Sequence, residues 1–356
     1  MRLALTEYRP DGTVRSSLRH GLCLTAMLIL TLWAMAARAC EIPEDYLTDI
    51  RPVAAEGPTI VSLGFGVADV LGVDDLNQQI ELDFYVRMSW FDPRLTELVG
   101  CRFPVTATWF PEIYILNSSQ LTEKRRNARN EVAIEDGGKV NYVNRYIGNI
   151  STYHNLRRFP FDSQIFDIEI SIPESSDNEI TLEQDYERIW LSEKLNIEGW
   201  DFSQISMGIE SRYLQQVQRD VSIATVKLNA QRNSTFYVYR MLLLLVAVVS
   251  MSWVIFWVPP GRFEFQFGLC ATAMLTAIAF NLSIASSLPH VGYLTIMDQL
   301  VIWAVLMIFL AAVQALVTAQ FYVKDHEPIA LRIDYYARYL FPLAFFGGWA
   351  IIIWVL

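Results

Sequence analysis

Four long apolar runs in the C-terminal third constrain this chain more than any other feature. Each run is long enough to cross the roughly 30 Å hydrocarbon core of a bilayer as a helix. The runs cover residues 236–258, 264–286, 300–323 and 335–356. The composition agrees, because 53% of the residues are hydrophobic and the mean hydropathy is positive. Residues 234–356 are therefore predicted to form a transmembrane domain of four helices.

The first 39 residues have the arrangement of a secretory signal peptide. Arginines precede an apolar core over residues 21–36, and Ala37-Arg38-Ala39 forms an A-x-A cleavage site. Cys40 follows directly, so a lipoprotein signal is the alternative, although Ala37 and Arg38 fit that pattern poorly. Ordinary cleavage after residue 39 is the prediction, and it exports the segment that follows.

The charge that remains is strongly negative. Residues 1–39 contain five arginines and two acidic residues of the totals of 28 and 38, so 23 basic and 36 acidic residues remain, a net charge of −13. This balance argues against nucleic-acid binding and is compatible with cations gathering near an exported domain. Cys40 and Cys101 are both on the exported side, where a disulfide is permitted. No residue spacing indicates a metal site, and no cofactor is predicted.

Residues 40–233 contain no apolar run of membrane length and repeat short alternating segments instead. Examples are residues 80–90, 140–146 and 165–172, and turn signals such as Asp92-Pro93 separate several of them. Alternation with period two and frequent turns favour an antiparallel, immunoglobulin-like β-sandwich. Another all-β fold is the alternative.

The charges in the predicted connections give an orientation. Arg262, Lys324 and Arg332 lie in the connections on one side, whereas the connection over residues 287–299 has no Lys or Arg. Positive residues favour the cytoplasmic side of a membrane. The N-terminal domain and the C-terminus of this multi-pass protein are therefore both expected outside.

The second apolar run carries a stripe of small and polar residues. Its members recur at spacings of three or four, which places them on one helix face. They are Glu264, Gly268, Thr272, Leu275, Ala279, Leu282 and Ser286. Several copies around an axis would give a charged mouth, a wettable middle and a hydrophobic constriction that gates by dewetting. The alternative is a packing helix whose small residues let neighbouring helices approach closely.

A series of short motifs runs in order through residues 58–356. They are V-D-D-L-N-Q at 73–78, W-F-D at 90–92, W-F-P-E at 109–112 with Asn117, F-P-F-D-S-Q at 159–164, Arg232 and Pro289. Together they resemble the first inter-strand loop, the W-x-D, the W-x-P-D…N and the signature F-P-F-D-x-Q of pentameric ligand-gated ion channels, the Cys-loop receptor superfamily. In that family a basic residue also precedes the first span, and a proline follows the pore helix.

The resemblance implies five identical subunits around a pore lined by the second span. It also implies that Asp162, Arg232 and Asp75 pair where the sandwich meets the spans, with Pro289 in the adjoining loop, and that this junction couples gating. A static ion pair is the alternative. Thr152 and Phe166 occupy the positions of the two signature cysteines, and the connection 324–333 is too short for an intracellular domain. Both departures resemble the bacterial branch, which implies the inner membrane and a periplasmic N-terminal domain.

The resemblance also implies an agonist site between subunits. Tyr85 falls on one position of the family's aromatic cage, Tyr213 lies near the expected capping loop, and Glu174 lies in a third binding segment. Leu116 occupies another cage position and no aromatic residue appears near residues 173–175, so an intact cation–π cage is not expected. The alternative is that Tyr85 and Tyr213 are ordinary amphipathic surface or interface residues. The agonist is either a small molecule or protons, since groups such as His154 could titrate.

The most favoured function is a cation channel opened by an extracellular signal. Five copies of Glu264 would ring the inner mouth and select monovalent cations, while Leu275, Ala279 and Leu282 would form the gate. Arg262 could face the pore instead, although anchoring against lipid headgroups suits it better. A non-conducting, membrane-anchored sensor is the runner-up. No catalytic motif favours an enzyme.

Overall fold

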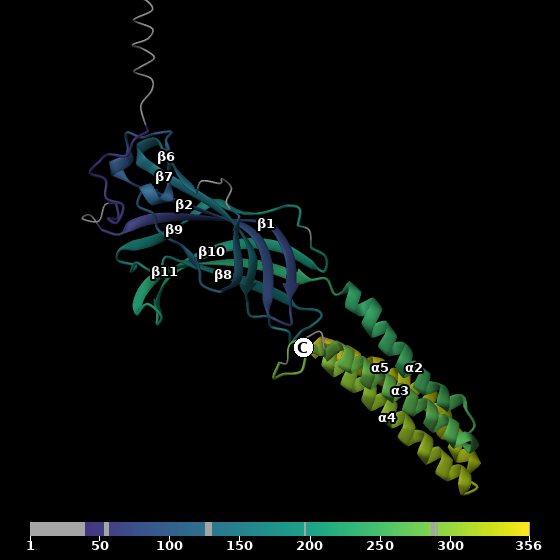
Figure 1. Ribbon diagram of the computed structural model, residues 1–356. Coiled ribbons are helices and arrows are strands. Elements are labelled where there is room, and N and C mark those ends of the chain that lie inside the picture. The colour runs from purple at the N-terminus through teal and green to yellow at the C-terminus, as the bar shows by residue number, and fades with distance from the viewer. Residues whose placement is uncertain are drawn as a thin grey trace, which may run out of the picture.

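The structure is a computed structural model that describes residues 40–52, 57–124, 130–195, 197–285, 289 and 291–355. The predicted signal peptide lies outside these residues. Strands come first along the chain and form one end of the molecule, and a bundle of long helices forms the other (Figure 1). The predicted β-sandwich followed by four membrane-length helices is confirmed.

The sandwich consists of two sheets. The strands are β1 Thr59–Asp74, β2 Gln79–Phe91, β3 Arg102–Pro104, β4 Tyr114–Ile115, β5 Ser118–Lys124, β6 Glu131–Glu135, β7 Lys139–Ser151, β8 Ser163–Ser171, β9 Ile180–Leu191, β10 Trp200–Leu214 and β11 Arg219–Arg232. One sheet has the order β3-β6-β7-β2-β1-β9, with β5 also on β7, and the other has the order β10-β11-β8-β4. All pairs are antiparallel except β1 with β9.

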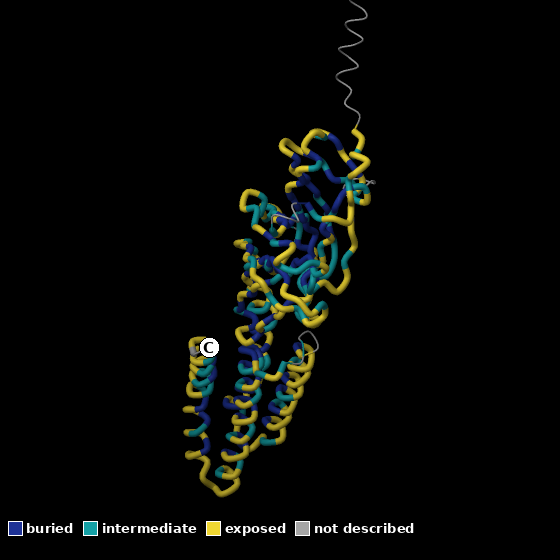
Figure 2. Tube along the Cα trace, turned by 90° about the vertical axis from the view of Figure 1, so that its left-hand side faces the viewer, coloured by how far each residue is buried: buried dark blue, intermediate teal, exposed yellow. Residues whose placement is uncertain are grey.

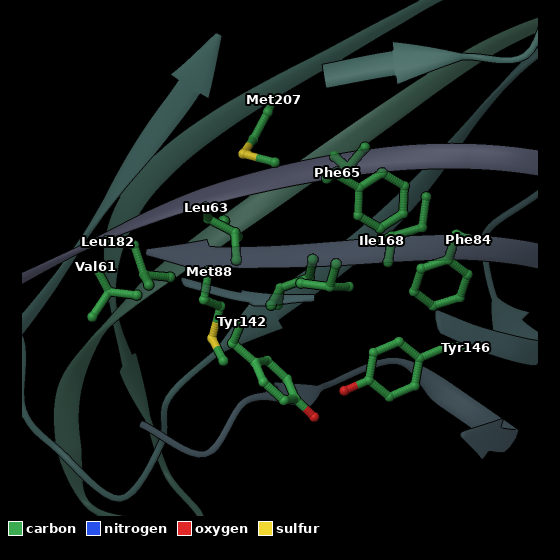
Figure 3. Close-up of a cluster of buried hydrophobic side chains, with 14 of the residues drawn as sticks. Val61, Leu63, Phe65, Phe84, Met88, Tyr142, Tyr146, Ile168, Leu182 and Met207 are labelled. Carbon is green, nitrogen blue, oxygen red and sulfur yellow. The ribbon is translucent and has the colours of Figure 1, made fainter. Parts of the chain in front are cut away.

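The alternating pattern of the strands builds the core between the sheets. On β2, Leu82, Phe84 and Val86 point inward, because side chains two apart share one face of a strand. The rings of Phe84 and Phe65 stack with centroids 5.1 Å apart. Figure 3 shows this cluster, where residues of β1, β2 and β7 meet Ile168 of the opposite sheet. Burial of this apolar layer fixes the register of every strand, since a shift by one residue would turn it to solvent.

A disulfide joins Cys40 to Cys101 and ties the first described segment to the sandwich. The Tyr46 hydroxyl extends this attachment by donating to Asp92 Oδ2 at 2.8 Å and accepting from the Trp109 backbone N–H at 2.9 Å. Burial is the main reason why the pKa of Tyr46 lies above its usual value. The N-terminal segment therefore lies along the sandwich.

The bundle contains four helices long and apolar enough to span a membrane. They cover Tyr237–Trp257, Pro260–Ala285, Ile296–Val323 and Glu327–Trp354. The first is a π-helical turn Tyr237–Leu242, then α2 Leu243–Trp253 and a 3₁₀ turn Val254–Trp257. The others contain α3 Phe263–Ala285, α4 Ile296–Val323 and α5 Glu327–Val355.

Two of these helices begin earlier than the apolar runs predicted. Helix α4 begins at Ile296 rather than residue 300, because Thr295 and Asp298 form a capping box ahead of the apolar stretch. Helix α5 begins at Glu327 rather than residue 335, and its first turns contain polar residues such as Arg332 and Asp334. Hydropathy detects the part of a helix that is apolar, whereas capping and backbone hydrogen bonds decide where the helix starts.

Figure 2 shows how the helices are arranged. Helix α5, marked by the C-terminus, and helix α3, which leads to the short grey segment, lie on opposite sides of the bundle. Helix α4 packs against both, and α2 also packs against α3. The C-terminal end lies at the sandwich end of the bundle, as four spans require. Each of the described spans also has exposed apolar residues, such as Leu243 of α2, Leu275 of α3, Ile302 of α4 and Leu343 of α5.

Candidate functional site

The predicted stripe on α3 faces away from the rest of the chain. Every described member is exposed, and the exposed fractions of Leu275 and Leu282 are 69% and 66%. The buried residues of α3 are Gln266, Cys270, Ala273, Ala277 and Ile284. At about 100° per residue these residues lie roughly opposite the stripe. Ser286 lies outside the described residues.

Specific contacts fix the rotation of α3 about its axis. The Gln266 amide is buried and donates through Nε2 to the carbonyl oxygens of Ile255 and Val258, at 3.2 and 3.0 Å. Ala273 and Ala277 are fully buried and let the neighbouring helices approach closely. Rotating α3 would break the Gln266 bonds and expose small side chains to lipid, so the stripe keeps its outward direction.

The stripe has a chemical gradient along its length. Glu264 lies near the start of α3, at the end remote from the sandwich, and Gly268 and Thr272 follow. The hydroxyl of Thr272 donates to Gly268 O at 2.9 Å, and its oxygen can still accept from water. Leu275, Ala279 and Leu282 present only apolar atoms toward the sandwich end. Along the described part of the stripe, the side chains therefore change from a carboxylate to a hydroxyl and then to apolar groups.

The structure brings Asp75, Asp162 and Arg232 together where the sandwich meets the bundle. Arg232 Nε lies 2.8 Å from Asp162 Oδ1, and Nη1 lies 2.6 Å from Asp75 Oδ2. The guanidinium carbon also lies 4.2 Å from the ring centre of Trp200 and 4.9 Å from that of Phe159. Arg232 is therefore held by two carboxylates and enclosed by two aromatic rings.

The electrostatics at the junction favour the charged forms of Asp75 and Arg232. Burial raises the pKa of Asp75, but hydrogen bonds from His154 and Arg232 outweigh it, so the pKa lies below its ordinary value. Burial lowers the pKa of Arg232, but the hydrogen bonds to Asp75 and Asp162 outweigh it and raise it overall. Removing one member of a buried ion pair typically costs about 3–5 kcal/mol, because the partner is left uncompensated.

His154 belongs to the same group, which sequence reasoning did not reveal. Its ring is fully buried, with Nδ1 3.0 Å from Asp75 Oδ1 and Nε2 2.9 Å from Thr152 Oγ1. The ring packs edge-on against Phe166, with centroids 5.3 Å apart. The available signal was its position two residues after Thr152, which stands where the family has its first signature cysteine.

The signature loop, residues 152–162, also holds the start of α4. The backbone N–H groups of Ile296 and Met297 donate to the carbonyl oxygens of Arg157 and Phe159, at 3.1 and 3.2 Å. Without such acceptors these first N–H groups of a helix have no intrahelical partner. The Tyr293 hydroxyl accepts from the Leu156 N–H at 3.0 Å, and the Phe159 ring packs edge-on against Tyr237. One loop therefore contacts Arg232, the first span and the connection between α3 and α4, in which Pro289 is half-buried.

The predicted agonist residues lie apart within one chain. Tyr85 is on β2, Tyr213 is on β10 in the other sheet, and Glu174 follows β8. Tyr213 is 56% exposed. Glu174 lies beside Tyr114 of β4, and its carboxylate accepts a hydrogen bond from the Tyr114 hydroxyl. The negative charge of Glu112 is the main reason why the pKa of Tyr114 lies above its usual value, and burial and Glu174 raise it further. Tyr85 and Tyr213 could meet only across a boundary between two copies.

The sequence did not predict two residues that lie beside Tyr85, Trp190 and Arg145. The centroids of the Trp190 and Tyr85 rings lie 6.1 Å apart. The guanidinium carbon of Arg145 lies 5.4 Å from the Tyr85 centroid, and Arg145 also forms an ion pair with Asp83. Trp190 covers Gly66 so closely that a Cβ there would lie 2.1 Å from the indole. The face around Tyr85 therefore contains a cation and a second aromatic ring. Among the described residues, no group of three or more His, Cys, Asp or Glu is placed to hold a metal ion.

A β-sandwich that leads into four membrane-length helices and packs its signature loop against them is the architecture of ligand-gated channels with extracellular binding domains. The family model for the neurotransmitter-gated ion-channel ligand binding domain matches residues 39–234. The chain therefore belongs to the pentameric ligand-gated ion channels, the Cys-loop receptor superfamily. The described part agrees with the branch expected, because Thr152 and Phe166 replace the signature cysteines and three residues join α4 to α5.

Several curated proteins are similar over much of the chain. A proton-gated ion channel of Gloeobacter violaceus is 25% identical over 311 residues, which is 85% of this chain and 84% of that protein. The human gamma-aminobutyric acid receptor subunit gamma-1 is 23% identical over 282 residues, 76% of this chain and 60% of the subunit. Ligand-gated ion channel 4 of Caenorhabditis elegans is 24% identical over 253 residues, 68% of this chain and 40% of that protein.

Proposed function

We propose that this protein is a cation-selective channel, built from five identical subunits, with α3 of each subunit lining the pore. The observation that carries the proposal is the exposed stripe on α3, which turns away from its own chain and runs from Glu264 to Leu282. Five such faces around an axis would leave no polar or small residue of the stripe against lipid. A non-conducting sensor would gain nothing from this arrangement.

The inner mouth would select the ion. Rings of Asp or Glu favour cations, and Glu264 is exposed at the inner end of the stripe. Arg262 is exposed two residues earlier and is assigned to lipid headgroups at the membrane surface. Leu275, Ala279 and Leu282 would form the closed gate, because an ion must shed hydration there with no polar group to replace it.

The opening signal acts on the sandwich. We assign the sandwich to the periplasm and the four spans to the bacterial inner membrane, in contact with lipid. An agonist between subunits would lie between Tyr85 of one copy and Tyr213 and Glu174 of its neighbour, and would be a small molecule. Protons are the second candidate, and similarity to a channel described as proton-gated favours them. Asp75, Asp162 and Arg232 would transmit the signal, with Pro289 in the loop that receives it.

Reconstitution tests the proposal. The purified protein is placed in a planar bilayer with asymmetric NaCl, and current is recorded while pH and a panel of small amines and acids are varied. A reversal potential near the sodium equilibrium value is expected, and Glu264→Gln should move it toward zero. A reversal potential near the chloride value contradicts the selectivity. Absence of current from a folded pentamer under every condition favours the sensor.

A further inference from the structure

His154 occupies a position where a change of charge would act directly on the junction. Its ring is fully buried, yet both nitrogens have polar partners: Asp75 at Nδ1 and Thr152 at Nε2. Asp75 is the same carboxylate that receives Arg232, and its Oδ1 is shared between His154 Nδ1 and Arg232 Nη2, which lies 3.0 Å away. An imidazole and a guanidinium therefore share one carboxylate oxygen atom.

The hydrogen bonds determine which ring nitrogen carries the proton. An ionised carboxylate only accepts, so His154 Nδ1 must donate to Asp75. In the neutral ring Nε2 is then an acceptor, and the Thr152 hydroxyl donates to it. This leaves one lone pair, at Nε2, where the ring can bind a further proton. The cavity of about 510 Å³ that is lined by Asp75, Trp200 and Arg232 lies beside this group.

The charged groups around the His154 ring have a net negative charge, which favours an added positive charge. Asp75 comes from the turn between β1 and β2, Asp162 from the signature loop and Arg232 from the end of β11. Phe166 of β8 packs edge-on against the His154 ring and adds no charge. Gln164 is also neutral, and its Nε2 donates a hydrogen bond to Asp162 Oδ2. With His154 neutral, the group has a net charge of −1. One proton brings it to zero.

We propose that His154 is a proton-binding site that regulates the coupling between the sandwich and the spans. A proton from the extracellular side adds to the Nε2 lone pair, Nε2–H then donates to Thr152 Oγ1, and the hydroxyl turns its own hydrogen away. No covalent bond breaks. The imidazolium takes a larger share of Asp75 Oδ1, which loosens Asp75 from Arg232 and leaves Arg232 with Asp162. This inference rests on the proposed coupling role of Arg232.

The first test uses pH steps alone as the probe. Channels are recorded in a Leu275→Ser background, chosen to give a standing current, with and without His154→Gln. The amide of Gln can still donate to Asp75 but binds no proton. Between about pH 8 and pH 5, where imidazoles ordinarily titrate, the open probability of the background should change about fivefold or more. With His154→Gln the change should fall below about twofold.

Matched controls exclude other titrating groups. His326 is exposed in the connection between α4 and α5, and its Nδ1 is hydrogen-bonded to the backbone carbonyl oxygen of Lys324. His326→Gln should therefore keep the full pH response. His290→Gln should keep it as well. An unchanged response in His154→Gln, or its loss in His290→Gln instead, overturns the proposal.

A second measurement does not depend on current or on the folding of His154→Gln. The ring nitrogens of ¹⁵N-histidine-labelled protein are followed against pH, with His154 identified by elimination through His20→Gln, His290→Gln and His326→Gln. The expected result is an Nδ1–H neutral ring that gains a proton within the same pH range. A ring that stays neutral throughout overturns the proposal even in a conducting channel. A titrating His154 in a protein that passes no current contradicts the channel function and leaves the proton site standing.

Discussion

At the junction, Arg232 is surrounded by partners from its own chain, whereas the stripe on α3 faces away from the other described elements of its chain. The first region is a finished polar cluster, with each charge paired at hydrogen-bond distance. The second has small, hydroxyl and leucine side chains that are exposed in the part of the chain the structure describes. The junction cluster therefore forms within one subunit, whereas the proposed pore and the proposed agonist site would need neighbouring subunits.

The largest expected effect comes from removing the cation at the junction. Arg232→Ala leaves Asp75 and Asp162 buried without a counter-charge, so it should lower the free energy of unfolding by about 3–5 kcal/mol. Thermal unfolding of the purified protein and size-exclusion chromatography of the pentamer measure this loss.

Arg212 provides the matched control for a charge on the surface. Its ion pair with Glu169 is partly exposed and its partner Glu210 is exposed, so Arg212→Ala should cost only about 0–1 kcal/mol. Equal costs for the two arginines would contradict the distinction between a buried cluster and a surface pair. A well-assembled Arg232→Ala channel with normal responses would remove the coupling role.

The pH dependence of the same cluster follows from Asp75. Its pKa is lower in the folded protein than in the unfolded chain, so its stabilisation is present above the ordinary carboxylate pKa of about 4 and disappears as pH falls through the folded value. Asp75→Asn should therefore cost about 1–3 kcal/mol at neutral pH and much less in strong acid. Thermal unfolding against pH measures both limits. A cost that does not shrink below about pH 4 would mean that the carboxylate charge is irrelevant.

The proposed gate allows a test of the exposed stripe on α3. Leu275→Ser puts a hydroxyl ring where the pore should be driest, so water enters the resting state and the channel leaks or opens at about tenfold lower agonist concentration. Ile278→Ser is the control, because Ile278 is an exposed residue of α3 that lies off the stripe. If both variants behave alike, or if Leu275→Ser expresses and stays shut with an unchanged agonist requirement, the gate lies elsewhere.

The smallest expected effect concerns the agonist. Loss of one aromatic partner of a cation costs about 0.5–2 kcal/mol, so Tyr85→Ala and Tyr213→Ala should each move a small-molecule concentration–response curve several-fold to the right. Tyr186→Ala is a suitable control, since Tyr186 is also strongly exposed on the sandwich. Curves that do not move after both substitutions would place the agonist outside this face.

Sequence was sufficient where one element decides its own structure. The alternation around Phe84 predicts a strand with one buried face, and the apolar runs predict the spans, because both patterns report burial directly. Spacing placed Glu264 and Leu282 on one face of α3 without any knowledge of its neighbours. The early starts of α4 and α5 were missed, because polar capping residues do not contribute to an apolar run.

Sites assembled from distant segments were harder to predict. Asp75, Asp162 and Arg232 were expected together through family motifs, whereas His154, Trp190 and Arg145 belong to no motif. Their positions depend on strand register and on how the two sheets pack. Long-range packing of this kind leaves no periodic trace in the sequence.

Cysteine accessibility can test whether the stripe of α3 lines a pore, as proposed. Thr272 and Ala273 are neighbours in sequence, but Thr272 is exposed on the stripe and Ala273 is fully buried on the opposite side. In a Cys270→Ala background, single cysteines at these two positions are treated with a charged methanethiosulfonate reagent during current recording. We expect rapid block through Thr272→Cys and no effect through Ala273→Cys. Block through Ala273→Cys alone, or an unreactive Thr272→Cys in an open channel, would contradict it.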